Sequence, residues 1–211
     1  MSKEVLKKNL LDLLRPRFKA SDFTLNKELG EFVKKQKGGW EKFQLIFLNR
    51  KDTWEINLGM LIRKDVIEDI YHQASSFDKK YQKGTPTIGI TVEKYINDGK
   101  EHRCYLGSED DIERCAQYIE NLFLKVAKPF FEEYDNIKAM DKAVNIKNGC
   151  SIFSGLKYEG NLGIILAKLV KNPDYDFFLE KYLNHYKTLA NGFYLPEYLK
   201  LVKVLDTPPP G

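Results

Sequence analysis

Cysteine is scarce in this sequence and is not arranged for disulfide pairing. The 211 residues include three cysteines, Cys104, Cys115 and Cys150, an odd number without regular spacing. Small secreted domains that depend on disulfides carry more cysteines at shorter intervals. The chain is therefore not expected to be a disulfide framework, and its cysteine usage favours a reducing compartment such as the cytoplasm.

Arginine is scarce as well, although lysine is abundant. There are 6 arginines and 28 lysines, and the formal net charge is only +4. Proteins that bind nucleic acids usually rely on arginine, whose planar guanidinium group matches phosphates and guanine edges. Nucleic acid is therefore not the expected partner of this chain.

One feature keeps a single-stranded nucleic acid open as an alternative. Trp40 and Trp54 fall near the ends of predicted strands, where their rings are suited to stacking on bases. The neighbouring lysines are Lys34, Lys35, Lys37 and Lys42. Such aromatic residues more often close the end of a core, with the lysines solvating a hairpin.

Long hydrophobic runs are absent. No stretch approaches about 18 apolar residues, the length that indicates a transmembrane helix. The N-terminal segment is charged and lacks the apolar core and cleavage site of a signal peptide. Hydrophobic residues still make up 43% of the chain, with 13 phenylalanines and 12 tyrosines. These features predict a globular cytoplasmic protein with a phenylalanine-rich core and no membrane partner.

Catalytic motifs are also absent from the sequence. It contains no GxSxG motif, no P-loop and no GxGxxG motif. His102 and Cys104 are two residues apart, but a zinc site needs about four ligands with paired spacing. Glu93 directly precedes Lys94, so in a strand the two side chains would lie on opposite faces. No catalytic residue, metal ligand or cofactor is predicted, and the balance is against an enzyme.

What is present is the pattern of an α+β protein. Apolar residues at helical spacing predict a first helix that ends or bends at Pro16. Alternating apolar residues and turn signals then predict an antiparallel meander of about five strands. The predicted strands cover residues 30–37, 40–49, 54–62, 87–97 and 102–106.

The strongest helical pattern covers residues 108–130. Ser108 stands three residues before Asp111, a variant of the capping-box pattern. Pro129 is expected to kink or shorten this helix, and Glu120 is expected to face water. The apolar stripe consists of Ile112, Cys115, Ile119, Phe123 and Val126.

These patterns divide the chain into three parts. Residues 1–148 are predicted to form the α+β domain, in which the long helix covers the sheet. Residues 149–206 read as helices and are predicted to pack on that domain as a helical C-terminal region. The tail, residues 207–211, contains three consecutive prolines and is predicted to be disordered.

Alternation along the strands assigns the side chains to two faces of the sheet. One face is apolar and is expected to be covered by the long helix; it includes Leu45, Phe47, Ile56, Leu58 and Ile90. The other face is mixed, and its two glycines mark places where a ligand or another segment of this chain comes close. The candidate binding face consists of Gln44, Glu55, Asn57, Gly59, Gly89 and Thr91.

Several segments resemble one known family. They are the LLRPRF stretch, the strand-rich run from FTLNKELGEF to NLGMLIR, and the later segments KPFFEEY and GNLGIILAKLV. Together they resemble the bacterial DUF4304-like family of domains of unknown function, with most of the likeness in residues 1–65. That family has no established catalytic residues, so the resemblance implies no site. Some α+β families of this appearance act as immunity partners of secreted toxins, which implies an immunity-like role by analogy of fold type.

Three functions follow as hypotheses. The first is a non-enzymatic protein that binds another protein. The second is an enzyme or small-ligand binder with a pocket over the mixed sheet face. The third is a single-stranded nucleic-acid binder that uses the lysine-rich tip.

Overall fold

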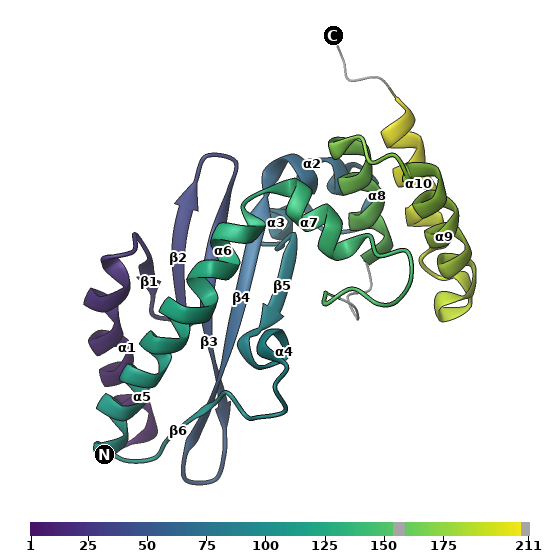
Figure 1. Ribbon diagram of the computed structural model, residues 1–211. Helices are drawn as coiled ribbons and strands as arrows, with labels where there is room; N and C mark the ends of the chain where they lie inside the picture. Colours follow the sequence, from purple (N-terminus) through teal and green to yellow (C-terminus); the bar gives the residue numbers. More distant parts are fainter. Residues whose placement is uncertain (154–158, 208–211) are drawn as a thin grey trace. The chain divides into compact units, whose positions relative to one another are not determined.

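The computed structural model describes residues 1–153 and 159–207 and shows an α+β protein (Figure 1). The chain forms two compact units, each built from two separate segments. The first unit comprises Met1–Ile62 and Ile88–Glu133, and the second comprises Arg63–Thr87 and Tyr134–Gly211. The predicted division at residue 148 differs from this, because the packing of residues 63–87 with helices far along the chain leaves no periodic signal in the sequence.

The first unit contains a six-stranded sheet. Its strands follow the order β1-β2-β3-β4-β5, and β6 pairs with β4. Strand β2 pairs antiparallel with β1 and with β3, and β4 pairs antiparallel with β5 and with β6. The strands are β1 (Thr24–Asn26), β2 (Glu31–Gln36), β3 (Gly39–Asn49), β4 (Trp54–Lys64), β5 (Ile88–Thr91) and β6 (Cys104–Leu106). The predicted antiparallel sheet is therefore confirmed.

The predicted single strand at residues 87–97 is wrong in its second half. Strand β5 ends at Thr91, and a short helix, α4 (Val92–Ile96), follows it. The Thr91 hydroxyl accepts a hydrogen bond from the Lys94 amide at 3.2 Å and so caps the helix. Asn97 closes it in the left-handed conformation, with φ of 51°. Capping at both ends outweighs the strand propensity of the sequence between them.

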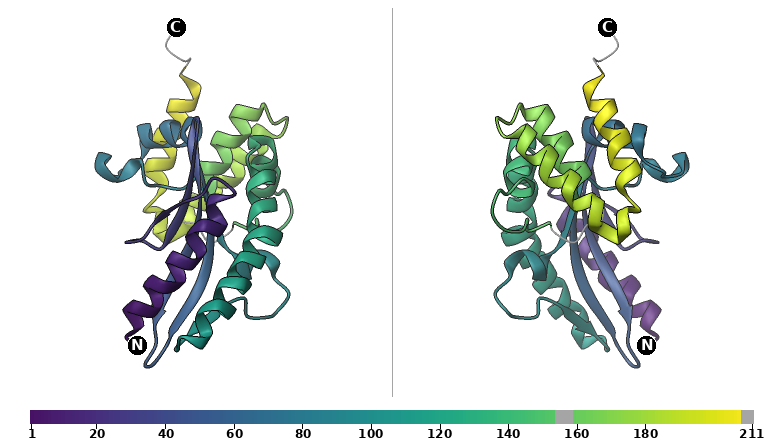
Figure 2. Two further views of the ribbon diagram at one scale, coloured as in Figure 1. Left: turned by 90° about the vertical axis from the view of Figure 1, so that its left-hand side faces the viewer. Right: turned by 90° about the vertical axis from the view of Figure 1, so that its right-hand side faces the viewer.

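Two helical segments lie on the apolar face of the sheet. The first is α1 (Lys3–Lys19), and the second runs through α5 (Asp110–Leu122), the π-helical turn η1 (Phe123–Ala127) and α6 (Lys128–Tyr134). Figure 2 shows the strands edge-on with α5 and α6 beside one face. Leu45, Ile56 and Leu58 are buried beneath them, which confirms the predicted covered face.

Aromatic rings form the centre of this core. Phe18 of α1 packs against Phe32 of β2 and against Phe123 of η1, each with ring centroids 4.4 Å apart. Phe43 of β3 contacts Phe123 at 5.3 Å and Phe18 at 5.6 Å. Helix α1 therefore shares the covering role that the sequence assigned to the long helix alone.

Of the outcomes predicted for Pro16 and Pro129, the ending or shortening of the helix does not occur. Helix α1 does not end at Pro16 but continues to Lys19, which places Phe18 in the aromatic core. Pro129 does not shorten its helix, which runs on to Tyr134. The α-helical pattern changes before it, in the π turn, where the Lys128 amide bonds to the Phe123 carbonyl. Pro129 is then the second residue of α6, where its missing N–H costs little.

Glu120, which is predicted to face water, has a side chain that is 33% exposed and pairs with α1. Its carboxylate accepts a hydrogen bond from Arg17 Nη1 at 2.9 Å, and Arg17 Nη2 bonds to Glu113 at the same distance. Arg17 thereby links α1 to α5. At the start of α5, the Asp111 carboxylate accepts bonds from the Ser108 amide and hydroxyl, which is half of the predicted capping box.

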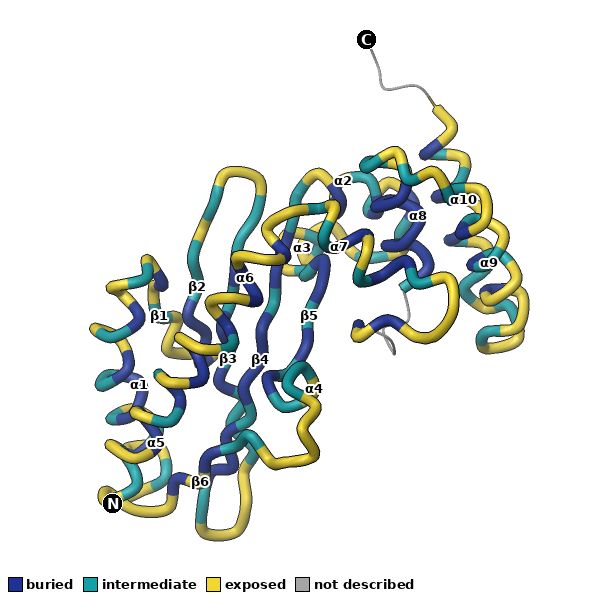
Figure 3. The backbone as a smooth tube through the Cα atoms, viewed as in Figure 1, coloured by how far each residue is buried: buried dark blue, intermediate teal, exposed yellow. Residues whose placement is uncertain are grey.

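The second unit is helical. Helix α8 is its most deeply buried element, with all residues from Gly160 to Ala167 buried (Figure 3). Its helices are α2 (Asp65–Ala74), α3 (Lys79–Gln82), α7 (Ile137–Val144), α8 (Glu159–Val170), α9 (Tyr175–Thr188), the 3-10 turn η2 (Leu189–Gly192) and α10 (Leu195–Asp206). Within the part of the chain that the structure describes, no helix is long and apolar enough to cross a membrane. Of the predicted disordered tail, residues 208–211 lie outside the described residues.

Replacing Gly163 by alanine should destabilise the second unit by about 1–3 kcal/mol, because the new methyl group would overpack the core. Its Cβ would lie 2.5 Å from the Tyr182 ring and 2.7 Å from Asn145 Oδ1. Urea denaturation followed by far-UV circular dichroism measures the loss. Gly84→Ala adds the same methyl group at an exposed position and should change stability by less than about 0.5 kcal/mol. Equal effects of the two substitutions would contradict this account of α8 packing.

Candidate functional site

The six residues of the predicted binding face lie on adjacent strands of the first unit. Gln44 is on β3, Glu55, Asn57 and Gly59 are on β4, and Gly89 and Thr91 belong to β5. Gly59 pairs with Thr91, and Gly89 pairs with Leu61 of β4. The structure therefore brings the predicted residues onto neighbouring positions of one sheet.

One of the two glycines of this face makes room for a side chain of the sheet itself. A Cβ at Gly89 would lie 2.4 Å from Leu61 Cδ2. A Cβ at Gly59 would lie 3.5 Å from the Gln44 side chain and 3.7 Å from Ile46 Cδ1, which are ordinary contact distances. Gly89 is thus explained without a ligand, whereas packing does not require glycine at position 59.

Glu55 takes part in an ion-pair network and is not available as an isolated carboxylate. It accepts hydrogen bonds from Arg50 Nε at 2.7 Å and from Arg103 Nη1 at 3.0 Å. Arg103 also bonds twice to Glu93, at 2.8 and 2.9 Å. The Arg103 hydrogen bonds hold the pKa of Glu93 at about 2. This network is a structural feature of the edge formed by β4, β6 and α4.

At the lysine-rich tip, an acidic group and an aromatic ring of the protein itself offset part of the positive charge. Lys42 bonds to Glu31 at 3.1 Å, and its ammonium lies 4.3 Å from the centre of the Trp40 ring. Trp54 is buried and donates its indole N–H to the Lys3 carbonyl at 2.9 Å. Trp54 is therefore packed within the protein itself, and the Trp40 ring contacts Lys42.

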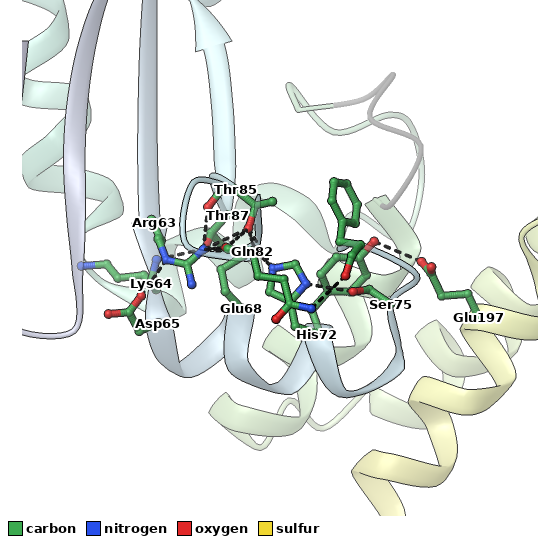
Figure 4. A network of polar contacts seen from close by, with 12 residues as sticks. Arg63, Lys64, Asp65, Glu68, His72, Ser75, Gln82, Thr85, Thr87 and Glu197 are labelled. Carbon is green, nitrogen blue, oxygen red and sulfur yellow. Dashed lines mark hydrogen bonds and ion pairs between the residues drawn. The ribbon is translucent and has the colours of Figure 1, made fainter. Parts of the chain in front are cut away.

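A buried polar cluster in the second unit was not predicted (Figure 4). We call it the Arg63 cluster; it consists of Arg63, Glu68, His72, Thr85 and Thr87. The Arg63 and Glu68 side chains are 5% and 6% exposed, with 3.7 Å between Arg63 Nη1 and Glu68 Oε2. Arg63 also donates to the carbonyls of Gln82 and Thr85 at 2.7 and 2.8 Å. The cluster ties helix α2 to the loop that precedes β5.

Hydroxyl groups fix the protonation pattern of this cluster. Thr85 and Thr87 donate to the two Glu68 oxygens at 2.7 and 2.9 Å. Since the Thr85 hydroxyl has a single proton, His72 Nε2, 2.9 Å away, must donate to it. His72 Nδ1 then accepts from the Ser75 hydroxyl at 2.8 Å. Burial raises the pKa of Glu68 above its ordinary value, and burial together with the Arg63 charge lowers that of His72.

This arrangement resembles a nucleophile and base, but two adjacent amides are already engaged. Ser75 bonds to a neutral imidazole, as a catalytic serine does. A tetrahedral oxyanion would need nearby amide donors. The Ser75 amide already bonds to the Tyr71 carbonyl, and the Ser76 amide bonds to Glu197. Neither of these two amides is free to stabilise an oxyanion.

The lowered pKa of His72 predicts a loss of stability in mild acid. Below the ordinary histidine pKa of about 6.5, the unfolded chain binds a proton at this position more readily than the folded chain does. The free energy of unfolding should therefore fall as pH drops from about 7.5 toward 5.5, and His72→Gln should make this fall shallower. Urea denaturation at both pH values tests it. His185→Gln makes the same change at an exposed position of α9 and should alter the free energy of unfolding by less than about 0.5 kcal/mol.

A hollow of about 440 Å³ lies beside this cluster, where the end of α2 meets the start of α10. Its walls include the rings of Tyr71, Phe77, Phe193 and Tyr194. Glu197 lines it and accepts four hydrogen bonds: from the Tyr71 hydroxyl at 3.0 Å, from Asn161 Nδ2 at 3.2 Å, and from the Ser76 amide and hydroxyl at 3.1 and 3.4 Å. All four donors are neutral groups, so these bonds orient the carboxylate without neutralising its charge.

The loop before α10 presents an aromatic ring at this hollow. Ala190, Asn191 and Gly192 are consecutive residues with φ of 48°, 54° and 80°. Left-handed backbone is strained for Ala190, and such strain is concentrated at functional sites. Phe193 follows directly and is 75% exposed. The loop therefore holds the apolar Phe193 ring at the surface, although the hydrophobic effect would favour burying such a ring in a core.

Sequence reasoning missed this hollow because its residues are far apart along the chain. Tyr71 and Glu197 are separated by 126 positions. The one local signal is the pair of adjacent aromatic residues, Phe193 and Tyr194, in a turn before Pro196.

Among residues 1–153 and 159–207, no group of three or more histidine, cysteine, aspartate or glutamate side chains is placed to hold a metal ion. Comparison of the chain with models of protein families, with curated proteins and with solved structures finds no match.

Proposed function

We propose that this protein binds a partner protein by receiving one of its cationic side chains in the hollow beside Glu197. The observation that carries this proposal is the Glu197 carboxylate, which is oriented by four neutral donors and surrounded by aromatic rings. Aromatic faces attract cations, and an adjacent carboxylate adds direct charge complementarity. This combination is the chemistry that recognises a guanidinium or ammonium group.

The end of helix α2 strengthens the preference for a cation. Ala74 is its last residue, and the partial negative charge of the helix C-terminus is concentrated on such carbonyls. Lys200 of α10 already places its ammonium 3.3 Å from the Ala74 carbonyl. The hollow therefore holds one cation of the protein's own at its edge, and Glu197 provides a separate position for a second.

The proposed function is the non-enzymatic binding that the sequence favoured. Its proposed site lies in the helical unit and not on the sheet face. An immunity-like role would be one instance of such binding. That role and the resemblance to the DUF4304-like family both stay predictions.

Two matched peptides test the proposal. One is a pentapeptide with a central arginine flanked by serine and glycine; the other carries citrulline, which has the same shape without the charge. Amide chemical shifts of Ser76, Phe193 and Tyr194 report on binding. The arginine peptide should bind roughly tenfold more tightly, a difference of about 1.4 kcal/mol.

Substitutions of Glu197 and Lys200 are expected to change the preference for arginine in opposite directions. Glu197→Gln should abolish the preference for arginine, whereas Lys200→Met should strengthen it by removing a competing cation. Phe193→Ser changes an exposed side chain and should weaken binding without affecting the fold. Glu180→Gln, the same chemical change at an exposed position of α9, is the control and should have no effect. Equal binding of the two peptides, or a preference that survives Glu197→Gln, would refute the proposal.

A further inference from the structure

A second hollow, in the first unit, has two thiols in its wall. Its volume is about 270 Å³, and it is lined by Arg103, Cys104, Tyr105, Arg114, Cys115 and Tyr118. Cys104 lies on β6 and Cys115 on α5, the next element along the chain. The backbone of β6 pairs with β4, where Cys104 faces Ile56, so both thiols are held by regular structure.

The two cysteines lie beside each other in the wall of this hollow. The Cys115 thiol donates a hydrogen bond to the Tyr105 carbonyl at 3.5 Å, and the Cys104 thiol beside its sulfur lowers the pKa of Cys115. The same neighbour, together with burial, raises the pKa of Cys104. Burial and the Asp111 charge oppose the shift at Cys115, and the Arg114 charge adds to it. The pair therefore consists of one sulfur suited to attack and one protonated thiol beside it.

We propose that Cys104 and Cys115 form a peroxide-reactive dithiol, in which Cys115 is the attacking sulfur and Cys104 the resolving one. The Cys115 thiolate attacks one oxygen of hydrogen peroxide, forms a sulfur–oxygen bond and releases hydroxide, giving a sulfenic acid. The Cys104 thiol then attacks that sulfur, and the sulfenic oxygen leaves as water with the thiol proton. The products are a disulfide and water; the peroxide is the oxidant and is reduced.

The arrangement favours a bond within one chain. Only ten residues separate the two cysteines, and their elements are consecutive. Cys104 is 5% exposed and Cys115 is 3% exposed. The hollow gives a molecule as small as hydrogen peroxide a route to their sulfur atoms. The third cysteine, Cys150, is exposed and belongs to the second unit.

The test uses the full chain with Cys150→Ser, so that two cysteines remain. Treatment with hydrogen peroxide should remove both free thiols and lower the intact mass by two hydrogen atoms. Trypsin cleaves after Arg103, Arg114 and Lys125, which places the cysteines on separate peptides, residues 104–114 and 115–125. Mass spectrometry without reductant should detect these two peptides joined by a disulfide.

Single alanine variants in the same background separate the two roles. With Cys104→Ala, oxidation should stop at a sulfenic acid on Cys115, which dimedone traps. With Cys115→Ala, loss of the remaining thiol should be at least about tenfold slower. The proposal is overturned if the Cys150→Ser protein keeps both thiols after peroxide, if the disulfide joins two chains, or if dimedone labels Cys104 as readily as Cys115. The joined peptides are observed without any change to the pair, so a variant that fails to fold does not affect that measurement.

Discussion

Replacing Arg63 by methionine should lower the free energy of unfolding of the second unit by about 3–5 kcal/mol. The substitution leaves the Glu68 carboxylate buried without its positive partner, and removal of one member of a buried ion pair costs about this much. The carbonyls of Gln82 and Thr85 also lose their donor. The loss should be smaller near pH 5 than at pH 7.5, because Glu68, whose pKa is already raised by burial, can then take up a proton. Urea denaturation followed by far-UV circular dichroism at both pH values measures these changes.

Arg50→Met is the matched control for this experiment. It makes the same chemical change in an arginine that also pairs with a glutamate, but the Arg50 side chain is 55% exposed. Ion pairs at the surface contribute about 0–1 kcal/mol. If Arg63→Met were no more damaging than Arg50→Met, the Arg63 cluster would not be the centre of stability that its burial indicates.

Replacing Phe123 by alanine should destabilise the first unit by about 3–5 kcal/mol. The ring is buried among Phe18, Phe23 and Phe43, with centroids 4.4, 5.1 and 5.3 Å away. Its removal leaves a cavity in addition to the lost transfer free energy. Both tryptophans of the chain lie in this unit, so tryptophan fluorescence in a urea titration reports its unfolding.

Substitutions at two neighbouring positions are the controls for this result. Leu124 is the next residue and is 49% exposed, so Leu124→Ala should cost less than about 0.5 kcal/mol. Glu120→Ala removes the bond to Arg17 and should cost about 0.2–1 kcal/mol. A loss at Glu120 or Leu124 as large as that at Phe123 would mean that the buried side of this helix has been assigned wrongly.

The sequence predicted those parts of the fold whose signal is local and periodic. The strands at residues 40–49 and 54–62 and the helix from residue 108 follow from alternation and from helical spacing. It failed where a single contact or cap decides the outcome. The Thr91 hydroxyl turns the chain into a helix after four strand residues, and the packing of Phe18 carries α1 past Pro16.

The candidate site could not be predicted for a different reason. Its parts come from α2 and α10, and no pattern within a window of residues connects Tyr71 with Glu197. The predicted site at Gly59 and Gly89 rested on the cost of glycine in a strand. The Leu61 side chain explains Gly89, whereas a Cβ at Gly59 would make only ordinary contacts. Buried polar clusters such as that of Arg63 depend on distant partners in the same way.

The π turn at Phe123–Ala127 links the length of this segment to the presence of Pro129. A π turn accommodates one residue more than an α turn, so deletion of one residue would allow α5 and α6 to merge into an unbroken helix. Because the wide turn itself takes up the extra residue, Phe130 and Phe131 would keep their buried register after that deletion. Pro129 would then lie inside the merged helix, where its ring clashes with the preceding turn. Functional descendants of this sequence should therefore lose the extra residue only together with Pro129.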